Sequence, residues 1–129
     1  MTIVRSRTSN LNPKETFLLW IEFDTLKKTA GQLAHRGIIN PVTKRPYTTM
    51  AVYYTAMKYV LENPDEAREY YLKYDADYAL DDEIWNEWLI GRALSMYKTK
   101  VRILSWLRRM GLDGDKYKHL YKDALGIYD

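Results

Sequence analysis

Hydroxyl and basic side chains gather in one short stretch of the chain. In chain order they are Lys44, Arg45, Tyr47, Thr48, Thr49, Tyr53 and Tyr54. Hydroxyls and the free N–H groups at the start of a helix can bind phosphate oxygens, and cations add affinity by releasing counterions. The stretch therefore predicts contact with a phosphate backbone. The alternative is that Tyr53 and Tyr54 belong to the core and that Lys44 and Arg45 lie on an ordinary solvated loop.

A second basic stretch follows about fifty residues later. Its candidate contact residues are Lys98, Thr99, Lys100, Arg102, Arg108 and Arg109. The helix-turn-helix resemblance of residues 89–112, given below, implies that the first four lie at the front of a helix and face a duplex, and that the two later arginines lie closer to the backbone. The alternative is a helical hairpin whose basic side is simply solvated.

The groups that most enzymes and metal sites need are scarce. The chain has no cysteine, and its two histidines, His35 and His119, are far apart in sequence. The aspartates near residues 75–87 lack the glycine and the terminal glutamate of a calcium loop. We therefore expect no metal, no cofactor and no catalytic activity. Absence of cysteine also favours a reducing, cytoplasmic setting.

Helical patterns account for nearly the whole chain, which predicts an all-α fold of about six to seven helices. Three of the expected helices are placed by their starts, near Asn12-Pro13, at Pro64 and at Asp81. The others are expected over residues 26–35, 48–63 and 99–110, with a short last helix over 117–124. The helix that begins at Pro64 is expected to carry the four tyrosines at 70, 71, 74 and 78, with the last three on one face. They are interpreted as core residues, with a protein interface as the alternative. Val101 is expected inside.

Three segments organise the chain. Residues 1–11 are expected to form a flexible basic arm and residues 12–63 a first helix-turn-helix unit. Residues 64–129 are expected to hold an acidic connector helix and a second, similar unit, with a single fused domain as the alternative. No stretch has the length and apolar character of a membrane-spanning helix.

The net charge of +3 conceals blocks of opposite sign. Residues 1–61 carry a net +6, residues 62–91 a net −8 and residues 92–129 a net +5. Two basic lobes around an acidic connector could bind a polyanion at two places. The other interpretation is that the acidic block pairs with the basic ones across the fold.

Residues 26–61 resemble the DNA-binding helix-turn-helix of serine recombinases and related mobile-element proteins. The resemblance rests on the order of a helix, a glycine, a proline-bounded turn and a hydroxyl-capped helix. The matching residues are Leu33, Gly37, Pro41, Pro46, Thr48 and Val52. The chain lacks that family's catalytic serine domain, so the resemblance implies DNA binding without recombination.

Residues 89–112 look like the helix-turn-helix of the factor-for-inversion-stimulation type. The matching residues are Ala93, Met96, Thr99, Val101, Leu107, Arg108, Arg109, Gly111 and Leu112. Two positions depart from that pattern, because Tyr97 stands at the usual glycine and Lys98 at the usual hydroxyl.

Together these patterns predict a non-catalytic protein that binds double-stranded DNA. Its small size and the resemblances favour a regulator or packaging accessory of a phage or other mobile element, located in the cytoplasm or nucleoid. The alternative is a structural or adaptor protein that binds proteins, or a second copy of itself, through its Tyr/Trp-rich helices.

Overall fold

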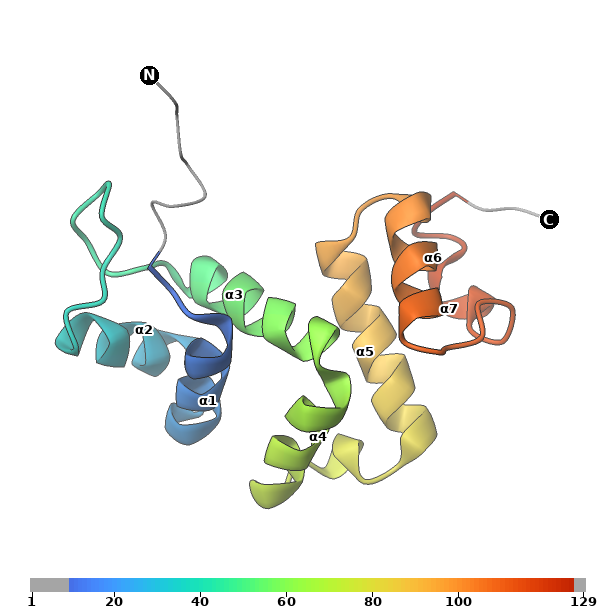
Figure 1. Ribbon diagram of the computed structural model, residues 1–129, viewed down its shortest axis with the longest axis horizontal. Coiled ribbons are helices and arrows are strands. Elements are labelled where there is room, and N and C mark those ends of the chain that lie inside the picture. Colours follow the sequence, from blue (N-terminus) through green and yellow to red (C-terminus); the bar gives the residue numbers. More distant parts are fainter. Residues whose placement is uncertain (1–9, 127–129) are drawn as a thin grey trace. The chain divides into compact units, whose positions relative to one another are not determined.

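The computed structural model describes residues 10–126, and these residues form helices and connecting segments without a strand (Figure 1). The predicted all-α fold with six to seven helices is confirmed. The elements are α1 (Pro13–Phe23), α2 (Leu26–His35), α3 (Thr49–Glu62), α4 (Pro64–Lys73), a 3-10 turn η2 (Asp77–Ala79), α5 (Asp82–Met96), α6 (Lys100–Arg109) and α7 (Lys118–Tyr121). Within this range no helix is long and apolar enough to cross a membrane. Residues 1–9 of the expected basic arm lie outside the described residues.

The chain divides into two compact units after Tyr74. Helices α1 to α4 build the first unit, and η2 with α5 to α7 builds the second. Our sequence-based boundary followed residue 63 and assigned α4 to a connector. In the structure α4 belongs to the first unit, because Ala67 is fully buried and Tyr71 packs on Phe17 of α1.

Five helices begin with the same device, a side-chain oxygen that accepts a hydrogen bond from the N–H three residues later. The capping residues are Asn12, Thr25, Thr48, Asp81 and Thr99, with donor–acceptor distances of 3.0 to 3.3 Å. Each such cap stabilises its helix by about 1 kcal/mol. The caps therefore determine where α3 and α6, the two candidate contact helices, begin.

Helices α2 and α6 end in the same way. Gly37 and Gly111 take the left-handed conformation, with φ of 80° and 71°. The next residue then donates back to a carbonyl inside the helix, from Ile38 to Leu33 at 2.8 Å and from Leu112 to Leu107 at 2.9 Å. This is the Schellman ending, in which glycine avoids the steric cost of the left-handed conformation.

Phe17 is the centre of the first unit and is fully buried. Its ring lies 5.1 Å from those of Tyr59 and Tyr71 and 6.3 Å from that of Tyr70, measured between ring centroids. A second cluster holds α2 and α3 together through Leu33 and Val52. Helix α3 is thus held against α1, α2 and α4 by contacts on its buried side.

A polar network joins α1, α3 and α4 beside Phe17. The buried hydroxyl of Tyr59 donates a hydrogen bond to Glu66, and Lys14 Nζ lies 3.3 Å from the other oxygen of that carboxylate. Burial, and then the hydrogen bond to Glu66, raise the pKa of Tyr59, so its hydroxyl stays protonated and remains a donor.

The second unit is built around the buried side chains of α5 and α6. Trp85 and Ile90 of α5, and Ile103 and Trp106 of α6, are at most 2% exposed. The segment after α6 is tied back by hydrogen bonds: Lys116 pairs with Glu83 at 2.7 Å, and Tyr121 donates to the Gly114 carbonyl at 2.7 Å.

The expectation that tyrosines 71, 74 and 78 share one helical face is wrong. Helix α4 ends at Lys73, and Asp75 takes a left-handed φ of 58°. Tyr74 is 58% exposed, and Tyr78 belongs to the second unit, where its ring stacks 4.7 Å from that of Trp88. The tyrosines keep a spacing of three and four residues beyond the end of the helix, and this spacing led to the wrong prediction.

The Tyr59–Glu66 network predicts a loss of stability in acid. Hydrogen bonds from Tyr59 and then Lys14 lower the pKa of Glu66 from its ordinary 4.5. A carboxyl group of this kind stabilises the fold above its unfolded-state pKa, and the contribution is lost as the pH falls through the lower folded-state pKa. We expect the free energy of unfolding, measured by urea denaturation, to fall below about pH 5 and Glu66→Gln to flatten that dependence.

Two variants complete this test. Tyr59→Phe keeps the ring on Phe17 and should cost about 1 kcal/mol, with a weaker acid dependence. Glu69→Gln alters a neighbouring exposed carboxylate of α4 and should behave like the wild type. Equal effects of Glu66→Gln and Glu69→Gln would contradict the role assigned to the network.

Candidate nucleic-acid interface

The loop between α2 and α3 is braced by its own hydrogen bonds. Asn40 N–H donates to the Arg45 carbonyl at 2.9 Å, and Lys44 N–H donates to the Asn40 carbonyl at 2.8 Å. The Asn40 side-chain oxygen accepts from Val42 N–H at 2.9 Å. Figure 1 shows the loop extending beyond the helices it connects. A basic loop held in one conformation loses less entropy on binding than a flexible one.

Lys44 and Arg45 are both exposed on this loop. Lys44 has a φ of 61°, a left-handed conformation that costs a residue with a side chain about 1 kcal/mol relative to glycine. A lysine at position 44 therefore lowers the free energy of unfolding relative to a glycine there.

Helix α3 presents its first turn and one exposed stripe. Thr48 and Thr49 are exposed, and the Thr48 side chain caps the helix through Ala51 N–H at 3.1 Å. Backbone N–H groups in a first helical turn lack partners within the helix and suit an anion. The predicted hydroxyls at 48 and 49 therefore lie beside such donors.

The exposed stripe of α3 consists of Met50, Tyr54 and Lys58, spaced four residues apart. Met50 is 58% exposed and Tyr54 36% exposed. Tyr53 is half-buried, with its ring between those of Trp20 and Tyr54 at 5.8 and 5.5 Å. Our sequence-based site omitted Met50 and Lys58, although their spacing from Tyr54 was a usable signal.

Tyr47 differs from the other predicted contact residues because it is only 7% exposed. Its hydroxyl donates to Asn10 Oδ1 at 2.7 Å and accepts from Asn10 N–H at 3.0 Å. Its ring belongs to the cluster of Leu33 and Val52. The structure thus gives Tyr47 a role in fixing the segment before α3, and we omit it from the candidate interface.

The charge around this surface is of one sign. Residues 25–61 contain six cations and no aspartate or glutamate. All six are exposed: Lys27, Lys28, Arg36, Lys44, Arg45 and Lys58. Among residues 10–126, none of them forms an ion pair. We call this acid-free stretch segment A. The sequence-based site missed the cations of α2 because only the loop and α3 were considered.

The second unit contains a similar stretch, residues 88–112, with six cations and again no carboxylate. We call it segment B. Five of its cations are exposed, namely Lys98, Lys100, Arg102, Arg108 and Arg109. Arg92 is half-buried and lies 5.8 Å from the centre of the Trp88 ring. No ion pair to any of the six occurs in the described part of the chain.

Helix α6 separates its cations from its apolar residues. Ile103, Trp106 and Leu107 are buried, whereas Arg102, Arg108 and Arg109 lie on the exposed side. Val101, which we expected inside, is 76% exposed. It lies outside the buried face, which is formed by Ile103, Trp106 and Leu107.

The connection between α5 and α6 also departs from the predicted turn. Tyr97 has an extended backbone, with φ of −105° and ψ of 100°, so it avoids the steric cost of a left-handed residue. Thr99 then caps α6, and the chain reverses direction between the two helices (Figure 1). The resemblance to the compact helix-turn-helix stays a prediction, with these two differences in geometry.

Two residues of the acidic block form ion pairs with lysines that lie outside segments A and B. Glu66 pairs with Lys14 in the first unit, and Glu83 pairs with Lys116 in the second. Within each unit, therefore, the acidic side chains do not neutralise the exposed cations through direct contact.

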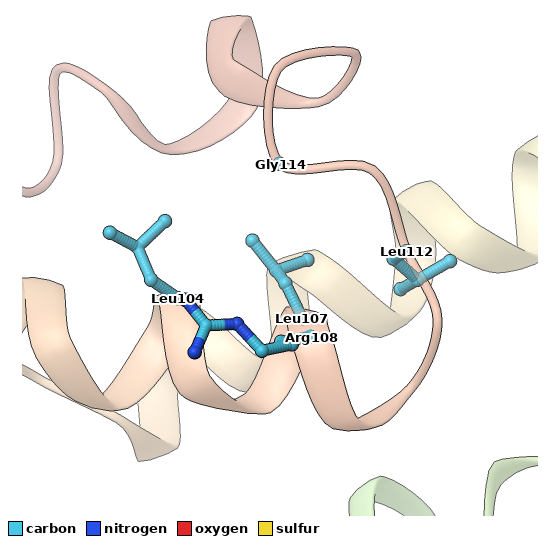
Figure 2. A pocket seen from close by; sticks show the side chains of 5 residues that line it. All are labelled: Leu104, Leu107, Arg108, Leu112 and Gly114. Atoms are coloured by element: carbon cyan, nitrogen blue, oxygen red, sulfur yellow. The ribbon is translucent and has the colours of Figure 1, made fainter.

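A small hollow adjoins the basic side of α6. Figure 2 shows its lining of Leu104, Leu107, Arg108, Leu112 and Gly114, and its volume is about 270 Å³. Its walls are mainly apolar. The described residues contain no cluster of three potential metal ligands, and both histidines are exposed.

The conformation of Lys44 leads to a stability prediction. Lys44→Gly should raise the free energy of unfolding by about 0.5–1 kcal/mol, because glycine takes a positive φ without a steric cost. Lys44→Gln removes the same charge and keeps the steric cost, so it should leave stability nearly unchanged. Urea unfolding of the two variants checks this. Equal stabilities would contradict the assigned backbone strain.

No family model matches this chain, and comparison with curated proteins and with solved structures gives no significant match. The candidate interface therefore rests on the geometry and charge described above.

Proposed function

We propose that this chain is a non-catalytic protein that binds double-stranded DNA. The observation that carries the proposal is segment A, in which six exposed cations occur over 37 residues without one carboxylate. Unpaired cations are available to replace the counterions of a phosphate backbone, and this exchange supplies most of the affinity for nucleic acid.

The shape of the surface favours a duplex. An α-helix fits the major groove, and its first turns are the part that approaches base edges and phosphates. Helix α3 offers Thr48, Thr49 and Tyr54 there, and the braced loop places Lys44 and Arg45 just before it in the chain. The loop cations would contact the sugar–phosphate backbone beside the groove.

A small regulator or packaging accessory of a phage or other mobile element fits this activity. The support is the resemblance of residues 26–61 to mobile-element helix-turn-helix proteins, together with the order of α2, loop and α3 in the structure. Such a protein would act in the cytoplasm or on the nucleoid.

A protein-binding adaptor is the second candidate. Leu80, which precedes α5, and Ile84 in the first turn of α5 are apolar side chains that are 71% and 51% exposed. The most deeply buried aromatic side chains serve the fold, because Trp85, Trp106 and Tyr59 are at most 5% exposed and pack inside the two units. The aromatic content thus supports stability more directly than partner binding.

A salt titration separates the two candidates. We expect fluorescence anisotropy with a random duplex to give an affinity that falls steeply as salt rises. The slope of log K against log salt equals about −0.9 for each phosphate neutralised. Absence of binding at low salt would overturn the DNA proposal.

The loop cations have a specific predicted contribution. The double variant Lys44→Gln with Arg45→Gln should bind about tenfold or more weakly near 0.1 M salt and reduce the salt slope by about 2, because two phosphate contacts are lost. Thermal stability should not fall, since both side chains are exposed and unpaired.

The matched control is Lys73→Gln with Lys122→Gln, which removes the same charge from outside segments A and B. It should bind almost as the wild type does. An equal loss in both double variants would show that net charge alone, and not the loop, governs binding.

A further inference from the structure

Each of the two units carries its own acid-free stretch of cations, and this pairing suggests more than a single contact. We propose that segments A and B bind the same DNA duplex at neighbouring positions, so that the chain is a bivalent clamp. This inference rests on the proposed function, because it extends DNA binding from the first unit to both.

The exposed side of α6 has the arrangement that such a second contact requires. Arg102 and Arg109 lie seven residues apart on α6 and are exposed, whereas Ile103 and Trp106 of the same helix are buried, and Lys98 lies just before the helix. Thr99 caps the helix and leaves its first-turn N–H groups beside Lys98 and Lys100. The cations therefore form a stripe of one sign on a rigid element.

The acidic residues between the two segments restrict where DNA can lie. Residues 62–87, from the end of α3 to the first half of α5, contain ten carboxylates and two cations. A phosphate backbone is repelled from this part of the chain. Phosphate contacts are thereby favoured at segments A and B.

The connection between the units limits the distance between the two contacts. Only residues 74–76 separate α4 from η2, a length of at most about 10 Å. A compact unit of the size of the larger one has a radius of gyration of about 11 Å and a diameter near 30 Å. The two surfaces are therefore within about 70 Å of each other, or about 20 base pairs of duplex.

This short tether favours one duplex over two. Once one segment is bound, the other meets the same duplex at an effective concentration in the millimolar range, far above the concentration of free DNA in a dilute assay. Two weak contacts on one molecule can then exceed either alone by 10²-fold or more.

The test compares duplexes of about 10 and about 30 base pairs with the full chain. The shorter duplex, about 34 Å long, accommodates one unit, whereas the longer one spans both contacts. The longer duplex offers roughly twenty times as many binding positions, which by itself raises the apparent affinity about twentyfold. Beyond that gain, we expect the wild type to bind the longer duplex about 100-fold or more tightly than the shorter one. The affinity for the longer duplex should also fall more steeply with salt.

The variant Arg102→Gln with Arg108→Gln isolates the second contact. It should lose most of the extra affinity for the longer duplex while its affinity for the shorter one changes by less than about twofold. The Lys73→Gln with Lys122→Gln pair again serves as the charge control. Thermal unfolding of each variant confirms that the fold is retained.

Three results would overturn the inference, and two of them leave the proposed function in place. If the variant Arg102→Gln with Arg108→Gln binds both duplexes as the wild type does, segment B is only a solvated surface and segment A is the sole contact. Energy transfer between two differently labelled duplexes at equal stoichiometry would show bridging of separate molecules. Failure of the wild type to bind either duplex would overturn the proposed function itself.

Discussion

Separation of exposed cations from carboxylates is the constraint on which the rest of this protein depends. Eleven exposed cations lie in segments A and B, and neither segment contains an aspartate or a glutamate. Like charges repel, so such surfaces slightly lower the free energy of unfolding. The fold therefore has to obtain its stability from other contacts.

Those contacts are found on the opposite sides of the same helices. Helix α3 buries Val52, Met57 and Val60, and α6 buries Ile103, Trp106 and Leu107. Threonine caps start both helices, and a Schellman ending closes α2 and α6. Glu66 and Glu83 form ion pairs with Lys14 and Lys116, which lie outside the two segments. The charged residues that form ion pairs within the fold are thus different from those proposed to bind DNA.

Local features could be predicted from the sequence with good accuracy. Caps such as Asn12, Thr48 and Thr99 and the glycines at 37 and 111 depend on neighbouring residues only, and the helix boundaries they imply agree with the structure. The tyrosine series failed because periodicity does not report where a helix stops, and the left-handed Asp75 follows the end of α4.

Long-range contacts explain the remaining differences in the site. Tyr47 resembled its exposed hydroxyl neighbours in sequence, and only its hydrogen bond to Asn10, 37 residues away, shows that it is structural. Helix α4 joined the first unit through Phe17, a contact that segment charge could not indicate. That residues 10–126 form no ion pair to segments A and B is likewise a property of the folded chain.

The most direct test of the central claim is an NMR titration of the isotope-labelled chain with a duplex of about 30 base pairs at low salt. The account predicts shifts of amide signals in the loop of residues 40–46, in the first turns of α3 and along the exposed side of α6. Signals of α4 and the first half of α5 should move little. Shifts centred on the acidic residues 62–87, with segments A and B unaffected, would contradict the account.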